Sequence, residues 1–177
     1  MRTLILWLIF SSPLFAQQYL TKNGEVRFFS KALIEDIQAV NEKAMAVIDL
    51  DSGEFAFKIG ISDFVFPNSL MQEHFNESYL ESHKYPHSTF TGTIEKVNDM
   101  SQKNDLTVRG NLIIHGISQE VTLPATMQQK EEGLHITSSF FVALEDYDID
   151  IPKIMMYKIA EEIEVTVDIT LQKRNNE

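Results

Sequence analysis

Residues 162–171 read EIEVTVDITL, and every second residue of this stretch is aliphatic. The aliphatic positions are Ile163, Val165, Val167, Ile169 and Leu171. The residues between them are Glu, Thr or Asp. Successive side chains of a β-strand point to opposite faces, so this period of two predicts a strand with one buried and one solvated face.

The same alternation recurs along much of the chain. It is clear in 54–61, 89–97, 105–114 and 134–144, and it is weaker but still compatible with strands in 25–30, 37–43 and 44–50. Gly, Asn and Asp occupy the short links at 51–53, 103–105, 115–116 and 132–133, as is typical of hairpin turns. We therefore expect an all-β fold with about eight antiparallel strands, either an up-and-down barrel or a closely related sandwich.

The polar faces of the strands indicate which side of the sheet is buried. If the apolar side faced lipid, as in an outer-membrane barrel, charged residues such as Lys58, Arg109 and Glu164 would crowd the lumen. A small barrel has little room for more than packed side chains. We therefore expect the apolar side to face inward.

One segment interrupts the strands: residues 71–86 read MQEHFNESYLESHKYP. Ser69 and Gln72 fit a capping box at the start of a helix, and Pro86 limits its end. We expect one short helix of about three turns here, after the fourth strand. An apolar stripe follows it at steps of four residues: Met71, Phe75 and Tyr79. Leu80 falls on the opposite, polar side, which indicates that the helix loosens there.

The histidines of this segment raise the question of a metal site. His74 and His83 are nine residues apart and would lie on opposite helix faces, and Pro86 breaks any helix that would align His83 with His87. His74, Glu77 and Glu81 share a face, but that arrangement equally describes a solvated stripe. No HExxH pattern occurs, so we expect neither a metal site nor another cofactor.

The sequence also lacks the common catalytic signatures. It contains no cysteine, no GxSxG elbow and no Gly-rich phosphate loop. Asp146 and Asp148 stand two residues apart, but the surrounding loop lacks the other oxygen ligands and the glycine of an EF-hand. We interpret them as a solvated turn and expect no catalytic residues and no enzymatic activity.

The first residues, MRTLILWLIFSSPLFA, predict a secretory signal peptide at 1–16, followed by one domain at 17–177. The apolar run is too short to span a bilayer, so we expect no integral membrane association and a periplasmic or secreted location. Without residues 1–16 the chain carries 14 basic and 26 acidic residues, a formal net charge of −12. Such a surface repels nucleic acid, which we exclude as a partner.

Four stretches together resemble the YceI-like family of lipid-binding proteins. They are KYPHSTFTG at 84–92, VRGNLIIHGISQEVTLPA at 108–125, FFVALEDYDIDIP at 140–152 and IAEEIEVTVDITL at 159–171. The resemblance covers nearly the whole chain after residue 16. It implies a lipocalin-like barrel, open at one end, that encloses a long-chain or polyisoprenoid lipid non-covalently and without catalysis.

The candidate ligand-binding residues come from the strands, the helix and one later loop. Those predicted to point into the barrel are Phe55, Phe57, Ile59, Phe90, Leu112 and Phe140. Met71, Phe75 and Tyr79 are placed as a gate, and Met155 as part of a second apolar rim. An eight-stranded barrel either holds one small ligand or is filled by its own side chains. The alternative function is therefore a solid barrel that binds another protein through its acidic surface.

Overall fold

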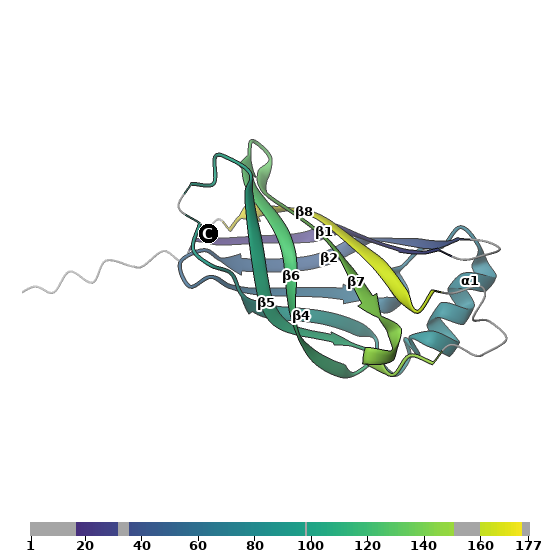
Figure 1. Ribbon diagram of the computed structural model, residues 1–177. Helices are drawn as coiled ribbons and strands as arrows, with labels where there is room; N and C mark the ends of the chain where they lie inside the picture. The colour runs from purple at the N-terminus through teal and green to yellow at the C-terminus, as the bar shows by residue number, and fades with distance from the viewer. Residues whose placement is uncertain (1–16, 32–35, 98, 151–159, 175–177) are drawn as a thin grey trace, which may run out of the picture.

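The computed structural model describes residues 17–31, 36–97, 99–150 and 160–174. In sequence order its strands are β1 (Gln18–Ser30), β2 (Ile37–Asp49), β3 (Glu54–Gly60), β4 (His87–Thr93), β5 (Asn104–Ile114), β6 (Ile117–Lys130), β7 (Gly133–Ala143) and β8 (Glu162–Lys173). Each strand pairs antiparallel with the next, and β8 pairs with β1 to close the barrel (Figure 1). The prediction of an eight-stranded up-and-down barrel is confirmed, and the sandwich is excluded.

The helix follows the third strand, so its predicted place after the fourth strand was wrong. The error lies in β2, which we expected to be two strands, 37–43 and 44–50. Glu42 and Lys43 are both exposed, and pairing with β1 shifts register at this point. The chain therefore continues through a β-bulge as one strand, although the bulge reverses the phase of its alternation.

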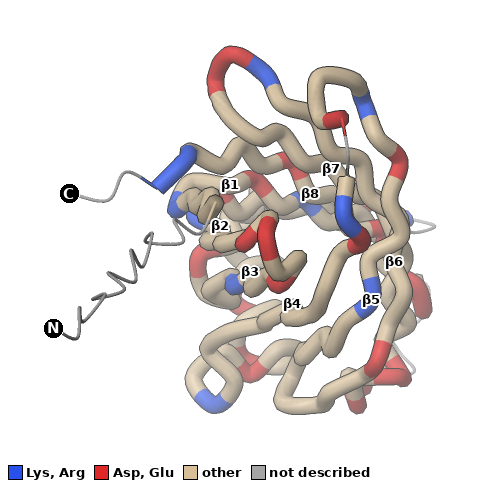
Figure 2. The backbone as a smooth tube through the Cα atoms, turned by 90° about the vertical axis from the view of Figure 1, so that its left-hand side faces the viewer, with Lys and Arg blue, Asp and Glu red and all other residues tan. Residues whose placement is uncertain are grey.

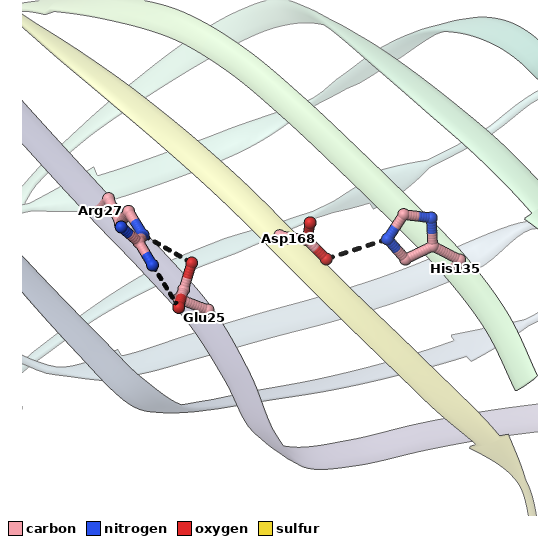
Figure 3. A network of polar contacts seen from close by, with 4 residues as sticks. All are labelled: Glu25, Arg27, His135 and Asp168. Atoms are coloured by element: carbon pink, nitrogen blue, oxygen red, sulfur yellow. Dashed lines mark hydrogen bonds and ion pairs between the residues drawn. The ribbon is translucent and has the colours of Figure 1, made fainter. Parts of the chain in front are cut away.

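Strand β8 lies between β1 and β7. Figure 3 shows two polar pairs on the solvated side of these three strands. Arg27 Nε donates to Glu25 Oε1 at 2.6 Å on β1, and His135 Nε2 donates to Asp168 Oδ1 at 2.9 Å between β7 and β8. Exposed pairs of this kind contribute little to stability, because water and salt screen them. Asp168 lies on the solvated face of β8, and the buried face of the strand carries most of the stability.

The two ends of the barrel differ. At one end lies a buried group that we call the far-end cluster: Tyr19, Ile48, Met127, Leu134, Ile169 and Leu171. At the other end lies the lid, defined as α1 (Ser69–His74) together with the π-helical turn η2 (Phe75–Tyr79). Figure 1 shows the lid at the right-hand end of the barrel, and Figure 2 shows the ring of strands from the opposite end.

Candidate ligand-binding cavity

The barrel encloses a cavity of about 500 Å³. This volume is within the range of roughly 300–1,000 Å³ that is usual for small-molecule sites. The predicted site residues that line it are Phe55, Phe57, Ile59, Met71, Phe75, Tyr79, Phe90, Leu112 and Phe140. The remaining one, Met155, lies outside the described residues. The structure thus brings strand and lid positions together around one space.

The wall of this cavity is almost entirely apolar. Among the described residues that line it there is no Lys, Arg, Asp or Glu. The polar side chains at the wall are Ser30, Asn68, His74, Tyr79, Ser88, Thr89 and Ser138. Such a wall favours an apolar ligand, because a charged group placed inside would lose its hydration without gaining a charged partner.

The phenylalanines do not fill the barrel because several of them pack against one another beneath the lid. Phe28 stacks on Phe75 with ring centroids 5.4 Å apart, and Phe64 and Phe66 lie 5.6 and 5.0 Å from the same Phe75 ring. Phe90 does not belong to this group. Its ring lies over Gly110 of the neighbouring strand, where there is no side chain. A Cβ at Gly110 would stand 2.9 Å from Phe90 Cε2.

The lid begins one residue earlier than its sequence signal indicates. The cap is Asn68, whose Oδ1 accepts hydrogen bonds from the N–H groups of Leu70 and Met71 at 2.9 and 3.3 Å. The predicted capping box of Ser69 and Gln72 is therefore wrong. Gln72 Oε1 instead accepts from the N–H of Phe66 at 3.3 Å and ties the lid to the segment before it.

The predicted loosening at Leu80 is confirmed, and it explains the apparent misfit of that residue. In η2 the N–H of Leu80 donates to the carbonyl of Phe75 at 2.9 Å, a π-type bond that widens the turn. The extra residue rotates Leu80 inward, and its exposure is only 9%. His74 also lines the cavity, whereas a regular three-turn helix places it on the solvated side.

A compact hydrogen-bonded group, the lid anchor, fastens the segment after the lid to the barrel. It consists of Glu81, His115 and the carbonyl of Tyr147. His115 Nε2 lies 3.0 Å from Glu81 Oε2, and Nδ1 lies 3.2 Å from the Tyr147 oxygen. A carbonyl and a carboxylate both accept, so both contacts are satisfied when each ring nitrogen carries a proton. The hydrogen bond from His115, aided by the charge of Lys84, lowers the pKa of Glu81.

Three of the four stretches that carry the family resemblance meet at this anchor, through Tyr85, His115 and Tyr147. The Tyr85 ring packs edge-on against His115 with centroids 4.5 Å apart, and it also covers Gly116. A Cβ at Gly116 would lie 2.6 Å from Tyr85 Cε1, and the backbone there has a φ of +77°. Glycine is required at this turn for both reasons.

Two other features, a metal-binding cluster and a membrane-spanning helix, are not found among the described residues. No three His, Cys, Asp or Glu side chains within them gather in a way that could hold a metal ion. None of the helices in that part of the chain is long and apolar enough to cross a membrane.

Fold and cavity define a class of protein, a closed antiparallel barrel around an apolar chamber. The family is shown by the sequence: the YceI-like domain model matches residues 18–171, and the chain belongs to the YceI-like family. A search among proteins of curated function finds no match.

Solved structures with a similar fold include the following three. The chain is similar to a polyisoprenoid-binding domain from Saccharophagus degradans implicated in plant cell wall breakdown, with a TM-score of 0.77, 12% identity, and 90% of this chain and 99% of that chain covered. Burkholderia cenocepacia BcnA has a TM-score of 0.72 and 18% identity, and the match covers 84% of this chain and 94% of that chain. The Campylobacter jejuni YCEI protein has a TM-score of 0.63 and 17% identity, and the match covers 82% of this chain and 90% of that chain. At these identities the likeness shows the fold alone.

Proposed function

We propose that this protein is a non-catalytic carrier that encloses one apolar long-chain or polyisoprenoid lipid in its barrel. The observation that carries the proposal is the cavity of about 500 Å³ with its uncharged, mainly apolar wall. Burying each CH₂ group of a ligand there contributes about 0.8 kcal/mol when the group leaves water completely. Binding strength therefore grows with the length of the apolar chain.

The comparisons support the ligand class. One of the structures that share this fold is described as a polyisoprenoid-binding domain. An extended isoprenoid or acyl chain suits a chamber that runs from beneath the lid to the far-end cluster, because residues of both line it. A solid barrel acting only through its acidic surface fits this interior less well, because a solid barrel has no cavity.

We propose that the carrier works in the periplasm or outside the cell. The support is the sequence of residues 1–16, which has the order of a signal peptide and lies outside the described residues. Mass spectrometry of the protein purified from cell fractions tests this location. We expect the chain to start near residue 17 and to be found outside the cytoplasm. An intact N-terminus held in the membrane fraction would refute this location.

The binding proposal is tested by titrating saturated alcohols of increasing chain length against wild type and Phe75→Asp. We expect wild-type affinity to rise by about fourfold per added CH₂ until the chamber is full. Phe75→Asp places a carboxylate at the cavity wall and should remove most of this gain. The matched control is Phe141→Asp, the same change at a position that is 66% exposed on β7.

The control variant should bind like wild type at every chain length. Equal weak binding by wild type and Phe75→Asp throughout the series would overturn the proposal, and the interaction-protein alternative would replace it.

A further inference from the structure

Ser88 is a buried hydroxyl with no assigned role. It is the second residue of β4, it pairs with Ile59 of β3, and it lines the cavity with 5% exposure. Among the described residues its hydroxyl has no hydrogen-bond partner, yet the oxygen is not fully enclosed by protein atoms. The open space that it faces is therefore the cavity.

The two other polar residues with buried side chains, Ser30 and Asn41, are satisfied within the protein. Ser30 accepts from the N–H of Ala160 at 2.9 Å, and Asn41 donates to the carbonyl of Gly60 at 2.9 Å. The hydroxyl of Ser138, also at the cavity wall, donates to the carbonyl of Pro124 at 2.6 Å. Asn76 Oδ1 of the lid also lacks a partner among the described residues, but Asn76 does not line the cavity. Since buried polar groups are usually hydrogen-bonded, Ser88, which does line it, calls for a partner that the protein does not supply.

The location of Ser88 indicates which end of a ligand it meets. β4 starts at His87, directly after the segment that joins it to the lid, so Ser88 lies at the lid end of the barrel. Tyr79 of the lid lines the same cavity, and its hydroxyl has no partner among the described residues either. Burial raises the pKa of Tyr79, so that its hydroxyl stays neutral. The far-end cluster, by contrast, is apolar apart from the tyrosine hydroxyl of Tyr19.

The described surroundings favour a neutral over a charged head group at this position. The described wall of the cavity contains no Lys or Arg. Lys84, which follows the lid, is already held 3.6 Å from Glu81 and over the ring of Tyr85. A phosphate inside the cavity would have no cationic partner among the described wall residues, whereas a neutral oxygen needs only one hydrogen bond.

We infer that Ser88 is the head-group subsite of the cavity, and that it binds the uncharged oxygen of a hydroxyl or carbonyl at one end of a long apolar chain. The chain itself extends from Ser88 toward the far-end cluster, so the ligand sits with its polar end beneath the lid. This inference rests on the proposed function and specifies its ligand as a neutral amphiphile.

A competition experiment tests the inference directly. Protein is equilibrated with an equimolar mixture of hexadecanol and hexadecane, separated from free lipid and extracted. Gas chromatography then gives the ratio of bound alcohol to bound alkane. The ratio is compared among wild type, Ser88→Ala, Ser88→Thr and Thr91→Ala. Thr91 is the matched control because it is an exposed hydroxyl on the same strand.

We expect the ratio to fall by about three- to tenfold in Ser88→Ala, as for the loss of one hydrogen bond. It should stay near the wild-type value in Ser88→Thr, which keeps the hydroxyl, and in Thr91→Ala. An unchanged ratio in Ser88→Ala, with both probes still bound, would overturn the subsite and leave the carrier standing. A wild-type protein that binds neither probe would overturn the carrier and the subsite together. Stronger binding of hexadecyl phosphate than of hexadecanol would overturn the neutral head group.

Discussion

At the scale of single residues, His115 links more parts of the molecule than any other polar side chain described above. It joins the segment after the lid, through Glu81, to the turn after β7, through the carbonyl of Tyr147. Its side chain is only 10% exposed, so water replaces these hydrogen bonds poorly when the ring is removed. The carbonyl of Tyr147 would then lose its contact with the ring, and Glu81 would keep only the more distant Lys84 at 3.6 Å.

We expect His115→Ala to lower the free energy of unfolding by about 1–3 kcal/mol, measured by urea denaturation. His83→Ala is the control, because His83 lies on the same connection but is exposed. Its effect should stay within about 0.5 kcal/mol of zero. Equal effects of the two substitutions would show that the lid anchor contributes nothing particular to stability.

The lid anchor also predicts a pH dependence through Glu81. The hydrogen bond from His115, and then the charge of Lys84, hold the pKa of this carboxylate below its ordinary value of 4.5. Its contribution to stability is therefore fully present above that value and is lost as the pH falls through the lower folded-state pKa. We expect the stability difference between wild type and Glu81→Gln to shrink in acid, as followed by thermal unfolding at a series of pH values. A difference that grows in acid would contradict this sign.

At the scale of elements, the lid depends on its π-helical turn. Leu80 turns inward there, with 9% exposure, while Leu70 at the start of the same lid is 56% exposed. We expect Leu80→Ala to cost about 2–5 kcal/mol of stability, as for other buried leucines, and Leu70→Ala less than about 0.5 kcal/mol. Chemical denaturation of both variants measures the contrast. Similar losses would mean that the lid packs as a regular helix.

The strands show where sequence periodicity is sufficient and where it fails. β8 alternates without interruption, and its two faces follow directly from the side chains of 162–171. In β2 the bulge at Glu42 and Lys43 shifts the phase, so one strand has the pattern of two. The lid shows an intermediate case, because the stripe of Met71, Phe75 and Tyr79 is periodic but the inward turn of Leu80 depends on a non-standard hydrogen bond.

The residues of the candidate site likewise divide into those that the sequence predicts and those that it does not. The inward phenylalanines were predictable because they occupy the apolar positions of alternating strands. Ser88 was not, because a serine within a strand carries no periodic signal, and only the barrel shows that its hydroxyl lacks a partner. The meeting of Tyr85 with His115 and Gly116 likewise depends on contacts between segments about 30 residues apart in the chain.

At the scale of the whole molecule, the net charge of the surface and the apolar cavity are separate features. The chain after residue 16 has a formal net charge of −12, carried by side chains outside the described cavity wall. Binding driven by apolar burial should therefore vary little with ionic strength. We expect the affinity for hexadecanol to change by less than about twofold between low and high salt. A steep loss of affinity with added salt would indicate that surface charge governs the interaction.

The central claim is that the barrel encloses an apolar lipid, and the most direct test is to look for one. The protein is purified from its own organism without detergent, extracted with organic solvent and examined by mass spectrometry. We predict an approximately equimolar apolar compound from wild type. It should be strongly reduced in Leu112→Trp, which fills the cavity, and retained in Val65→Trp, a change at a position that is 65% exposed. An extract that contains no bound compound, from a protein that also takes up none of the added chains, would contradict the account.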